Sequence, residues 1–334
     1  MKKKGFLYAA IALTGLTLGA GQALTAQRTA TLATHAVGSL YNALGTGLAS
    51  VVSRQSPILI RVQPFAGPPA WLPSMDRGET DMGLLTSADA VLSSKGMVLY
   101  KKPYKNTRIL IVGGAVYFGF YVPKDAPIET VADLKGKRLP TEWPGIPIIK
   151  LSTGASLATA GLTLDDIVRV PVSDLAAASQ AFLEGRTDAG WVGMGGAVVE
   201  EANARKGGVK YVSVIDTPEA AKRMADIYPG SYPGVVKAGT ATGVIKDTTL
   251  LANDIYLVGG KELSDETAYQ VVKTLWDRNS ELGGAFHLLK TWVRDRMVSK
   301  RAVIPYHPGA VRFFKEKGAW SKEMDDLQAK LLAQ

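Results

Sequence analysis

The sequence predicts a mixed α/β fold made of two lobes that are joined by two crossing strands. Strand and helix signals alternate along the N-terminal part of the chain, a pattern typical of layered α/β units with parallel strands. The same order of signals returns about one lobe later. The length of 334 residues also exceeds one ordinary hydrophobic core, since domains usually hold ~100–200 residues.

The first unit opens with a strand at residues 32–34, a loop at 35–39 and a helix over 40–54. Apolar or small residues recur along this helix at the spacing of one buried stripe. Ser39 is a good N-cap, and the free N–H groups of a first helical turn attract a carboxylate or a phosphate. A second interpretation, a capped helix that binds nothing at this end, stays open on these residues alone.

The rest of the first unit follows the same pattern. A β-branched run at 58–63 predicts a buried strand, and a short helix is expected from about Ala70. A tight turn at 78–83 leads into a strand at 84–85 and a helix at 88–94. Strand, helix, strand and helix in this order predict parallel strands with right-handed crossovers.

The second unit repeats this order. It has a strand at 167–172, a helix at 174–183 that Ser173 is expected to cap, and a strand at 191–192. The turns at 78–83 and 185–190 share the pattern Gly-x-Thr-Asp-x-Gly. Since a six-residue match alone can arise by chance, the matching elements around it carry the inference of two related lobes.

Two apolar strands are expected to cross between the lobes, one at 117–122 and a return strand at 254–258. Ser264 then caps a helix, and the last third of the chain is helical, with Pro308 near the first position of a helix. We therefore expect lobe one to comprise residues 27–116 plus 250–334, and lobe two residues 117–249.

Residues 1–26 have the layout of a secretory signal peptide. Three lysines precede an apolar run at 5–21, and small residues then offer cleavage sites. An uncleaved membrane anchor is the rival, but the run contains Thr14, Gly15, Thr17 and Gly19 and is shorter than the ~20 apolar residues of a membrane span. We expect export to the periplasm by a cleavable signal peptide.

The composition excludes several chemistries and favours none that is catalytic. The chain has no cysteine, which excludes disulfides, thiolate catalysis and iron–sulfur clusters. Its three histidines show no metal-ligand spacing, so we expect no metal and no cofactor. The net charge of +9 is scattered and locally balanced, which does not indicate nucleic-acid binding. The absence of a catalytic set favours a binding protein over an enzyme.

Several segments, in this order and at these intervals, resemble the TAXI family, the solute receptors of one class of TRAP (tripartite ATP-independent periplasmic) transporters. The segments are Gly38-Ser39-Leu40-Tyr41, the turn at 78–83, Ser87-Ala88-Asp89, the element at 131–138, Ala160-Gly161-Leu162-Thr163 and the stretch 307–318. The resemblance covers nearly the whole chain after residue 26. The element at 131–138 also occurs across many two-lobed receptors and supports the fold more than the family.

The resemblance implies a two-lobed fold like that of type II periplasmic binding proteins. It also implies that the lobes close on a small carboxylate-bearing solute, which is then delivered to a membrane permease driven by an ion gradient. We expect a monomer that binds a small organic anion. The alternatives are a receptor of an ABC importer or of a sensor kinase, and a secreted enzyme on the same scaffold.

Ligands of such sheets bind beyond the C-terminal ends of the strands, which gives a set of candidate ligand-binding residues. They are His35, Ser39, Tyr41, Asn42, Gly67, Trp71, Thr86, Ser87, Trp143, Gly145, Trp191 and Gly193. Ser39, Tyr41 and Asn42 would hold the carboxylate with helix N–H groups, and Thr86 and Ser87 would present a second helix start. Gly67 and Gly193 would let the backbone approach the solute. For His35, packing in the loop is an equally good interpretation.

The departures from the family pattern indicate a different solute. Hydrogen-bonding loops of similar receptors are replaced here by apolar or aromatic residues at 67–71 and 144–147, and a glutamine is replaced by Thr86. We hypothesise an acid that is larger or more apolar than a plain amino acid, with Trp71, Trp143 or Trp191 against its body. The alternative is that these tryptophans pack between the lobes or line an interface.

Overall fold

The computed structural model describes residues 28–144 and 147–334. Its strands are β1 (Arg28–Thr34), β2 (Ile58–Pro64), β3 (Met82–Thr86), β4 (Arg108–Pro123), β5 (Arg138–Glu142), β6 (Val168–Val172), β7 (Gly190–Gly193), β8 (Val209–Tyr211), β9 (Ser231–Val236) and β10 (Thr248–Gly259). Its α-helices are α1 (Leu40–Gln55), α2 (Pro68–Asp76), α3 (Ser87–Lys95), α4 (Pro147–Ala158), α5 (Leu175–Leu183), α6 (Ala197–Arg205), α7 (Pro218–Ile227), α8 (Asp265–Asp277), α9 (Leu282–Ala285), α10 (Arg294–Met297), α11 (Pro308–Glu316) and α12 (Lys322–Leu332). Short 3-10 helices lie at Val131–Leu134, Asn279–Glu281 and His287–Thr291.

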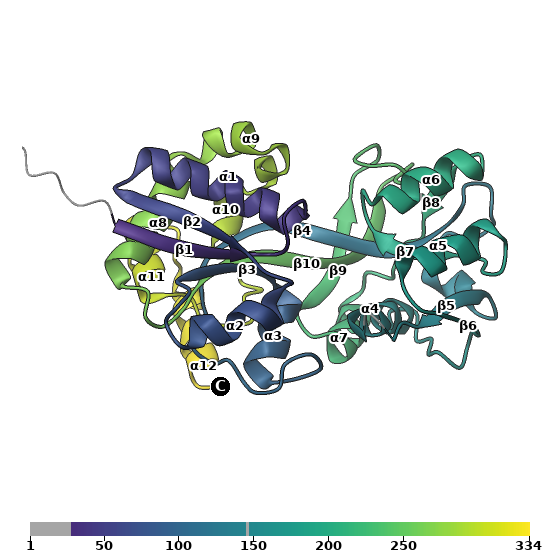
Figure 1. The fold of residues 1–334 in the computed structure, drawn as a ribbon. Coiled ribbons are helices and arrows are strands. Elements are labelled where there is room, and N and C mark those ends of the chain that lie inside the picture. Colours follow the sequence, from purple (N-terminus) through teal and green to yellow (C-terminus); the bar gives the residue numbers. More distant parts are fainter. Residues whose placement is uncertain (1–27, 145–146) are drawn as a thin grey trace, which may run out of the picture.

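Two lobes of α/β structure lie side by side and are joined by β4 and β10 (Figure 1). We call the group of β1–β3, α1–α3 and α8–α12 lobe one, and the group of β5–β9 and α4–α7 lobe two. The expected two-lobed α/β fold with two crossing strands is confirmed. The strands expected at 117–122 and 254–258 are the C-terminal parts of longer strands, because β4 and β10 each continue through both lobes.

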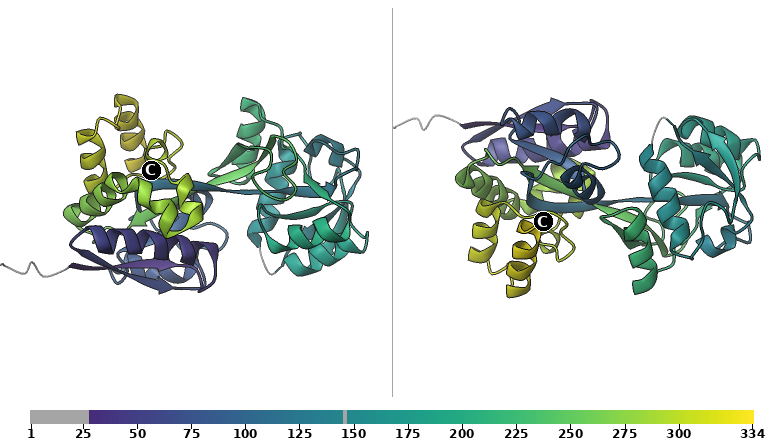
Figure 2. Two further views of the ribbon diagram at one scale, coloured as in Figure 1. Left: turned by 90° about the horizontal axis from the view of Figure 1, so that it is seen from above. Right: turned by 90° about the horizontal axis from the view of Figure 1, so that it is seen from below.

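The crossing strands form the centre of one continuous sheet. Its order is β2-β1-β3-β10-β4-β7, with β8 paired to β4 and β9 paired to β10, while β5 and β6 form a separate parallel pair. β4 and β10 are antiparallel, and their register shifts between Asp254 and Tyr256 and again between Leu257 and Val258. Figure 2 shows helix α1 and the C-terminal helices on opposite sides of these strands.

In lobe one, β1 pairs in parallel with both β2 and β3. The C-terminal ends of the three strands therefore meet at one edge of the sheet, and this edge points towards lobe two (Figure 1). Helix α1 packs close to this sheet, since a Cβ added to Gly45 would lie 2.4 Å from Cγ2 of Thr34. The candidate residues that follow β1, β2 and β3 are brought to the same edge.

The two copies of the Gly-x-Thr-Asp-x-Gly turn have the same structural role. Gly78 and Gly185 have φ of 76° and 75°, values at which glycine is favoured. The Asp81 carboxylate accepts hydrogen bonds from N (2.7 Å) and Oγ1 (2.8 Å) of Thr31 in the middle of β1. The Asp188 carboxylate accepts bonds from N (2.7 Å) and Nη2 (2.6 Å) of Arg138 at the start of β5. Each aspartate thus ties its turn to the first strand of its own lobe.

Helix caps agree with the sequence at some positions and differ at one. Ser39 and Ser264 cap α1 and α8 as predicted, each accepting a bond from a backbone N–H three residues later. The prediction that Ser173 caps α5 is wrong, because Asp174 takes this position and accepts a bond of 2.9 Å from N of Ala177. Helix α2 begins at Pro68, two residues before the predicted start, since proline fits a first helical turn.

His307 caps helix α11 and is almost fully buried. Its Nδ1 accepts a hydrogen bond from N of Gly309 (3.2 Å), and its Nε2 lies 3.0 Å from the carbonyl oxygen of Leu263. Burial is the main cause that lowers the pKa of His307 from its usual 6.5. The ring is therefore neutral at pH 7 with its proton on Nε2.

This cap predicts a pH dependence of stability. Because the pKa of His307 is lower in the folded state than in the unfolded state, acid favours unfolding, and stability falls as the pH drops below about 6.5. Urea unfolding at pH 7.5 and at pH 5.5 measures this fall. In His307→Gln we expect the fall to be smaller than in the unmodified protein. An equal fall in both proteins would show that the proton is taken up elsewhere.

No helix in the described part of the chain is long and apolar enough to cross a membrane. The segment predicted as a signal peptide lies outside the described residues.

Candidate functional site

The start of helix α1 offers free hydrogen-bond donors. Oγ of Ser39 accepts a bond of 3.1 Å from N of Asn42, and the carbonyl oxygen of Ser39 accepts from N of Ala43. Within residues 28–144 and 147–334, the N–H groups of Leu40 and Tyr41 have no hydrogen-bond acceptor. These two donors, with the positive end of the dipole of a 16-residue helix, are suited to a carboxylate.

The side chain of Asn42 supports the helix start rather than projecting from it. Its Nδ2 donates a bond of 3.0 Å to Oγ1 of Thr34 at the end of β1. The prediction that Ser39, Tyr41 and Asn42 hold a solute therefore has to be divided between side chains and backbone. The Ser39 and Asn42 side chains fix the helix start, and the backbone N–H groups remain for a ligand.

His35 and Tyr41 form a stacked pair beside this helix start. Their ring centroids are 4.2 Å apart, at an interplanar angle of 22°. Burial lowers the pKa of His35, although the nearby charge of Asp89 opposes this effect, so the imidazole is neutral at pH 7. Its Nε2 is buried and has no partner in the described part of the chain. Gly67 lies close by, because a Cβ added there would be 4.0 Å from this Nε2.

A carboxylate stands at the start of helix α3. Thr86 caps α3, and its Oγ1 accepts from N of Asp89 (3.0 Å) and donates to Oδ2 of Asp89 (2.8 Å). The other oxygen of Asp89 accepts from the hydroxyl of Tyr100 at 2.8 Å. Burial and then the charge of Asp89 raise the pKa of Tyr41 and of Tyr228. The carboxylate of Asp89 is therefore close to a tyrosine of lobe one and to a tyrosine of lobe two.

Ser87 belongs to a contact between the lobes rather than to an open helix start. Its Oγ donates to the carbonyl oxygen of Gly230 (2.6 Å) and accepts from N of Asp254 (3.1 Å). A Cβ added to Gly230 would lie 2.5 Å from O of Ser87 and 2.8 Å from N of Ala88. The chain at Gly230 thus covers the start of α3, and the hydroxyl of Ser87 is already bonded on both sides.

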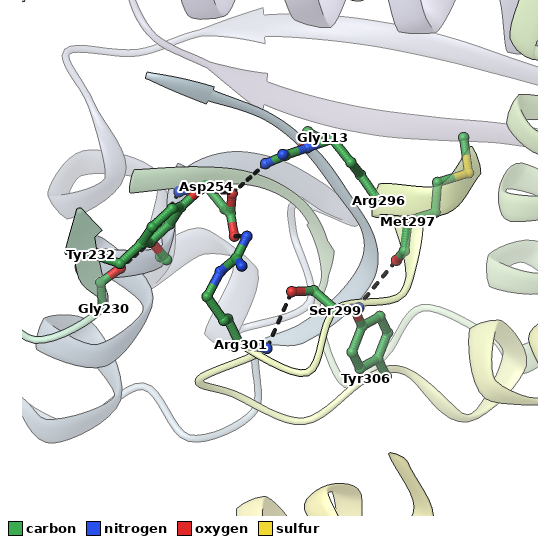
Figure 3. Close-up of polar contacts among 10 residues, drawn as sticks. Gly113, Gly230, Tyr232, Asp254, Arg296, Met297, Ser299, Arg301 and Tyr306 are labelled. Atoms are coloured by element: carbon green, nitrogen blue, oxygen red, sulfur yellow. Dashed lines mark hydrogen bonds and ion pairs between the residues drawn. The ribbon is translucent and has the colours of Figure 1, made fainter. Parts of the chain in front are cut away.

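A buried carboxylate with two arginines lies on the other side of this contact (Figure 3). The carboxylate of Asp254, on β10, is 1% exposed. It accepts bonds from the hydroxyl of Tyr232 on β9 (2.7 Å) and from Nη2 of Arg296 (2.5 Å), and Nη2 of Arg301 is 3.9 Å away. Nε of Arg296 also donates to the carbonyl oxygen of Gly113 on β4 (2.9 Å). Burial and Asp254 raise the pKa of Tyr232 to about 12. We call Tyr232, Asp254, Arg296 and Arg301 the hinge cluster.

The three candidate tryptophans are buried within their lobes. The Trp71 side chain is fully buried and its ring covers Gly83, where an added Cβ would lie 2.5 Å from Cη2. Trp143 is also fully buried and has a φ of 48°. Trp191 packs edge to face against Phe120, with ring centroids 4.8 Å apart. In this structure, Trp71 and Trp143 present no surface to a solute, while the neighbouring Gly145 lies outside the described residues.

Trp191 and Gly193 do share a small cavity of about 70 Å³ in lobe two. Its lining is mostly apolar: Phe118, Ile148, Ile149, Ser152, Leu175, Trp191, Val192, Gly193 and Tyr228. This volume is far below the ~300–1,000 Å³ of a small-molecule site. The cavity lies next to the residues that face lobe one. Burial raises the pKa of Tyr228, which lines the cavity, and Tyr228 is also close enough to Asp89 and Tyr41 of lobe one for their charges to raise its pKa further.

The structure thus gathers His35, Ser39, Tyr41, Asn42, Gly67 and Thr86 at the edge of lobe one, and Trp191 and Gly193 in lobe two. Sequence reasoning missed Asp89 and Tyr228 as members of this region. The Thr86-x-x-Asp89 spacing is a capping-box pattern and was a usable signal for Asp89. No local sequence signal pointed to Tyr228, because contacts with residues far away in the sequence place it. No cluster of three potential metal ligands occurs in the described ranges 28–144 and 147–334.

Comparison with known proteins places the chain in a family. Residues 32–318 match the model of the NMT1-like family, and the chain belongs to this family. Its fold is that of two-lobed solute-binding proteins. A TctC solute binding protein from Polaromonas, solved without ligand, has 17% sequence identity and a TM-score of 0.52, with 78% of this chain and 88% of that chain covered.

Two further solved structures are similar at lower scores. The L-cystine solute receptor of Neisseria gonorrhoeae, in its unliganded open conformation, is 14% identical with a TM-score of 0.47, over 80% of this chain and 96% of that one. A putative sulfonate-binding protein SsuA from Methylobacillus flagellatus KT is 15% identical with a TM-score of 0.48, over 88% of each chain.

Proposed function

We propose that the chain is an extracytoplasmic solute receptor that captures a small organic acid between its lobes and delivers it unchanged to a membrane permease. The two-lobed fold, the family and the similarity to a TctC solute binding protein support the receptor class. The finer assignment to the TAXI family and a TRAP permease rests on the sequence resemblance. The signal peptide at 1–26 and the periplasmic location are proposed from the layout of the N-terminal residues, and the lobe boundaries at 116/117 and 249/250 from the expected crossing strands. The monomeric state is part of the same proposal.

One observation carries the choice of an acid as the solute. The N–H groups of Leu40 and Tyr41 are free at the start of a long helix, and that start faces lobe two beside the neutral ring of His35. A carboxylate bound there would accept both N–H bonds and the favourable helix dipole. No lysine or arginine is needed for this interaction.

The start of α3 is a weaker position for the carboxylate than the sequence suggested. Asp89 already places a negative charge there, and Gly230 covers the first turn. We therefore propose α1 as the site of the acid group. For the body of the solute we propose the side of lobe two that carries Trp191 and Gly193, with Phe118 and Tyr228 beside them. Trp71 and Trp143 are left out of this revised site because they are fully buried.

Removal of a single backbone donor tests the site. Leu40 is the first residue of α1, where proline is tolerated, and Ser39 has the extended conformation that a residue before proline prefers (φ −76°, ψ 158°). Leu40→Pro deletes one N–H group. We expect the affinity for the acid, measured by calorimetry, to fall about 10- to 100-fold relative to Leu40→Ala, which loses the same side chain but keeps the N–H group. Equal affinities of the two variants would place the carboxylate elsewhere.

The solute itself has to be found before this comparison can be made. Mass spectrometry of small molecules that co-purify with the protein should identify an organic acid, and calorimetry with that acid should show stoichiometric saturation. We expect the acid to be recovered unaltered after incubation. A product that differs from the added acid would contradict the receptor function and favour an enzyme.

A further inference from the structure

An apolar tip projects from lobe one just after helix α3. Met97, Val98 and Leu99 are 42%, 49% and 44% exposed, and they are consecutive in the sequence. We call residues 97–99 the apolar tip. Single exposed apolar residues are common on protein surfaces, but three large ones in one turn form a patch that suggests contact with something other than water.

The apolar tip is built into the fold rather than left as a loose loop. N of Met97 donates to the carbonyl oxygen of Leu92 (2.9 Å), and N of Tyr100 donates to that of Met97 (3.1 Å). Gly96 ends α3 with a φ of 66°. Val98 has a φ of 58°, which is strained for a β-branched residue. The turn thus holds three apolar side chains outward in a backbone conformation that valine disfavours.

Basic residues flank the apolar tip in the sequence. Lys95, Lys101, Lys102 and Lys105 are all exposed. The sequence has no aspartate or glutamate from residue 90 to residue 124, and Asp76, which pairs with Lys102 at 2.8 Å, belongs to helix α2. Exposed apolar side chains flanked by exposed lysines match an anionic lipid surface, where the apolar side chains enter the interface and the ammonium groups meet phosphates.

We propose that the apolar tip and the lysines around it dock lobe one on a membrane surface that carries anionic phospholipid. This inference rests on the proposed function, since a receptor that serves a permease works at a membrane. The contact is small, so docking is reversible. Tyr100, the residue after the tip, donates to Asp89 at the other end of α3. The docking surface therefore follows the C-terminal end of α3, while Thr86 at the N-terminal end of α3 belongs to the edge of lobe one beside the candidate solute site.

Vesicle binding tests the proposal. The protein purified after export is sedimented with vesicles of phosphatidylglycerol and phosphatidylcholine in equal parts, and with vesicles of phosphatidylcholine alone. We expect binding to the anionic vesicles only. In the triple variant Met97→Ser, Val98→Asn, Leu99→Ser, the partition coefficient should fall at least about tenfold. Asparagine tolerates positive φ, so this variant keeps the turn.

A matched pair of charge variants separates the tip from the general positive charge of the protein. Lys95→Glu with Lys101→Glu should abolish binding to the anionic vesicles, whereas Lys290→Glu with Lys322→Glu, at two exposed lysines of the C-terminal part, should retain most of it. The two double variants change the net charge equally. Equal losses in both would overturn the proposal.

Two other outcomes would also overturn it. One is vesicle binding by the triple tip variant that equals that of the unmodified protein. The other is loss of permease-dependent uptake in that variant with vesicle binding unchanged, which would make the permease protein the partner. Calorimetry with the solute is an independent readout. A protein that binds vesicles as expected but no organic acid would contradict the proposed receptor function and leave the docking surface in place.

Discussion

Replacement of Asp254 by alanine is expected to lower the free energy of unfolding by about 3–5 kcal/mol. The Asp254 carboxylate is 1% exposed and neutralises Arg296, whose side chain is 30% exposed. Without it, the guanidinium of Arg296 and the hydroxyl of Tyr232 lose their shared partner in a largely buried part of the protein. Urea unfolding followed by circular dichroism measures the change.

Glu201→Ala provides the control for this experiment. Glu201 pairs with Arg205 on the surface of helix α6 at 3.0 Å, and both side chains are about half exposed. Exposed pairs of this kind contribute little to stability, so the urea midpoint should hardly move. If Asp254→Ala unfolds at nearly the same urea concentration as Glu201→Ala, the hinge cluster does not hold the protein together.

Replacement of Trp71 by alanine is the second change for which we expect a large effect. The ring is fully buried and lies against Gly83, so its removal leaves a cavity in lobe one. Large-to-small changes of this type cost about 3–5 kcal/mol of stability. Urea unfolding gives the cost, and calorimetry on the folded variant gives the affinity for the identified acid, which should stay within about threefold if Trp71 does not touch the solute.

Trp71→Phe serves as the matched variant. Nε1 of Trp71 has no hydrogen-bond partner within the described residues, so phenylalanine loses packing but no hydrogen bond. We expect it to be clearly more stable than Trp71→Ala. The opposite pattern, full stability of Trp71→Ala with loss of solute binding, would restore the hypothesis that this ring lies against the body of the solute.

Features that depend on local sequence were predictable from the chain alone. Helix α1 follows from the periodicity of its apolar residues and from Ser39, and α11 begins at Pro308 because proline suits that position. The aromatic run at 117–122 is predicted as a crossing strand because it lies between the two repeated units. Each of these patterns spans only a few neighbouring residues, so it can be read without knowledge of the tertiary structure.

The candidate site was less predictable because long-range contacts assign its side chains. Ser87 looks like an open helix start in the sequence, but its partners Gly230 and Asp254 are 143 and 167 residues away. Trp71 is placed by the missing side chain of Gly83. Whether a polar or aromatic side chain meets a ligand or the protein core is decided by tertiary packing, and no local pattern of residues reports it.

Continuity of β4 and β10 through both lobes limits how the proposed closure can proceed. No flexible linker separates the lobes along these strands, so a change of the angle between them has to be taken up as extra twist and bend of a hydrogen-bonded ribbon. The two register shifts, at residues 254–256 and 257–258, are where such a ribbon bends most easily. The pivot would then lie beside Asp254, and amide hydrogen exchange at 254–258 should respond to the solute although none of these residues belongs to the candidate site.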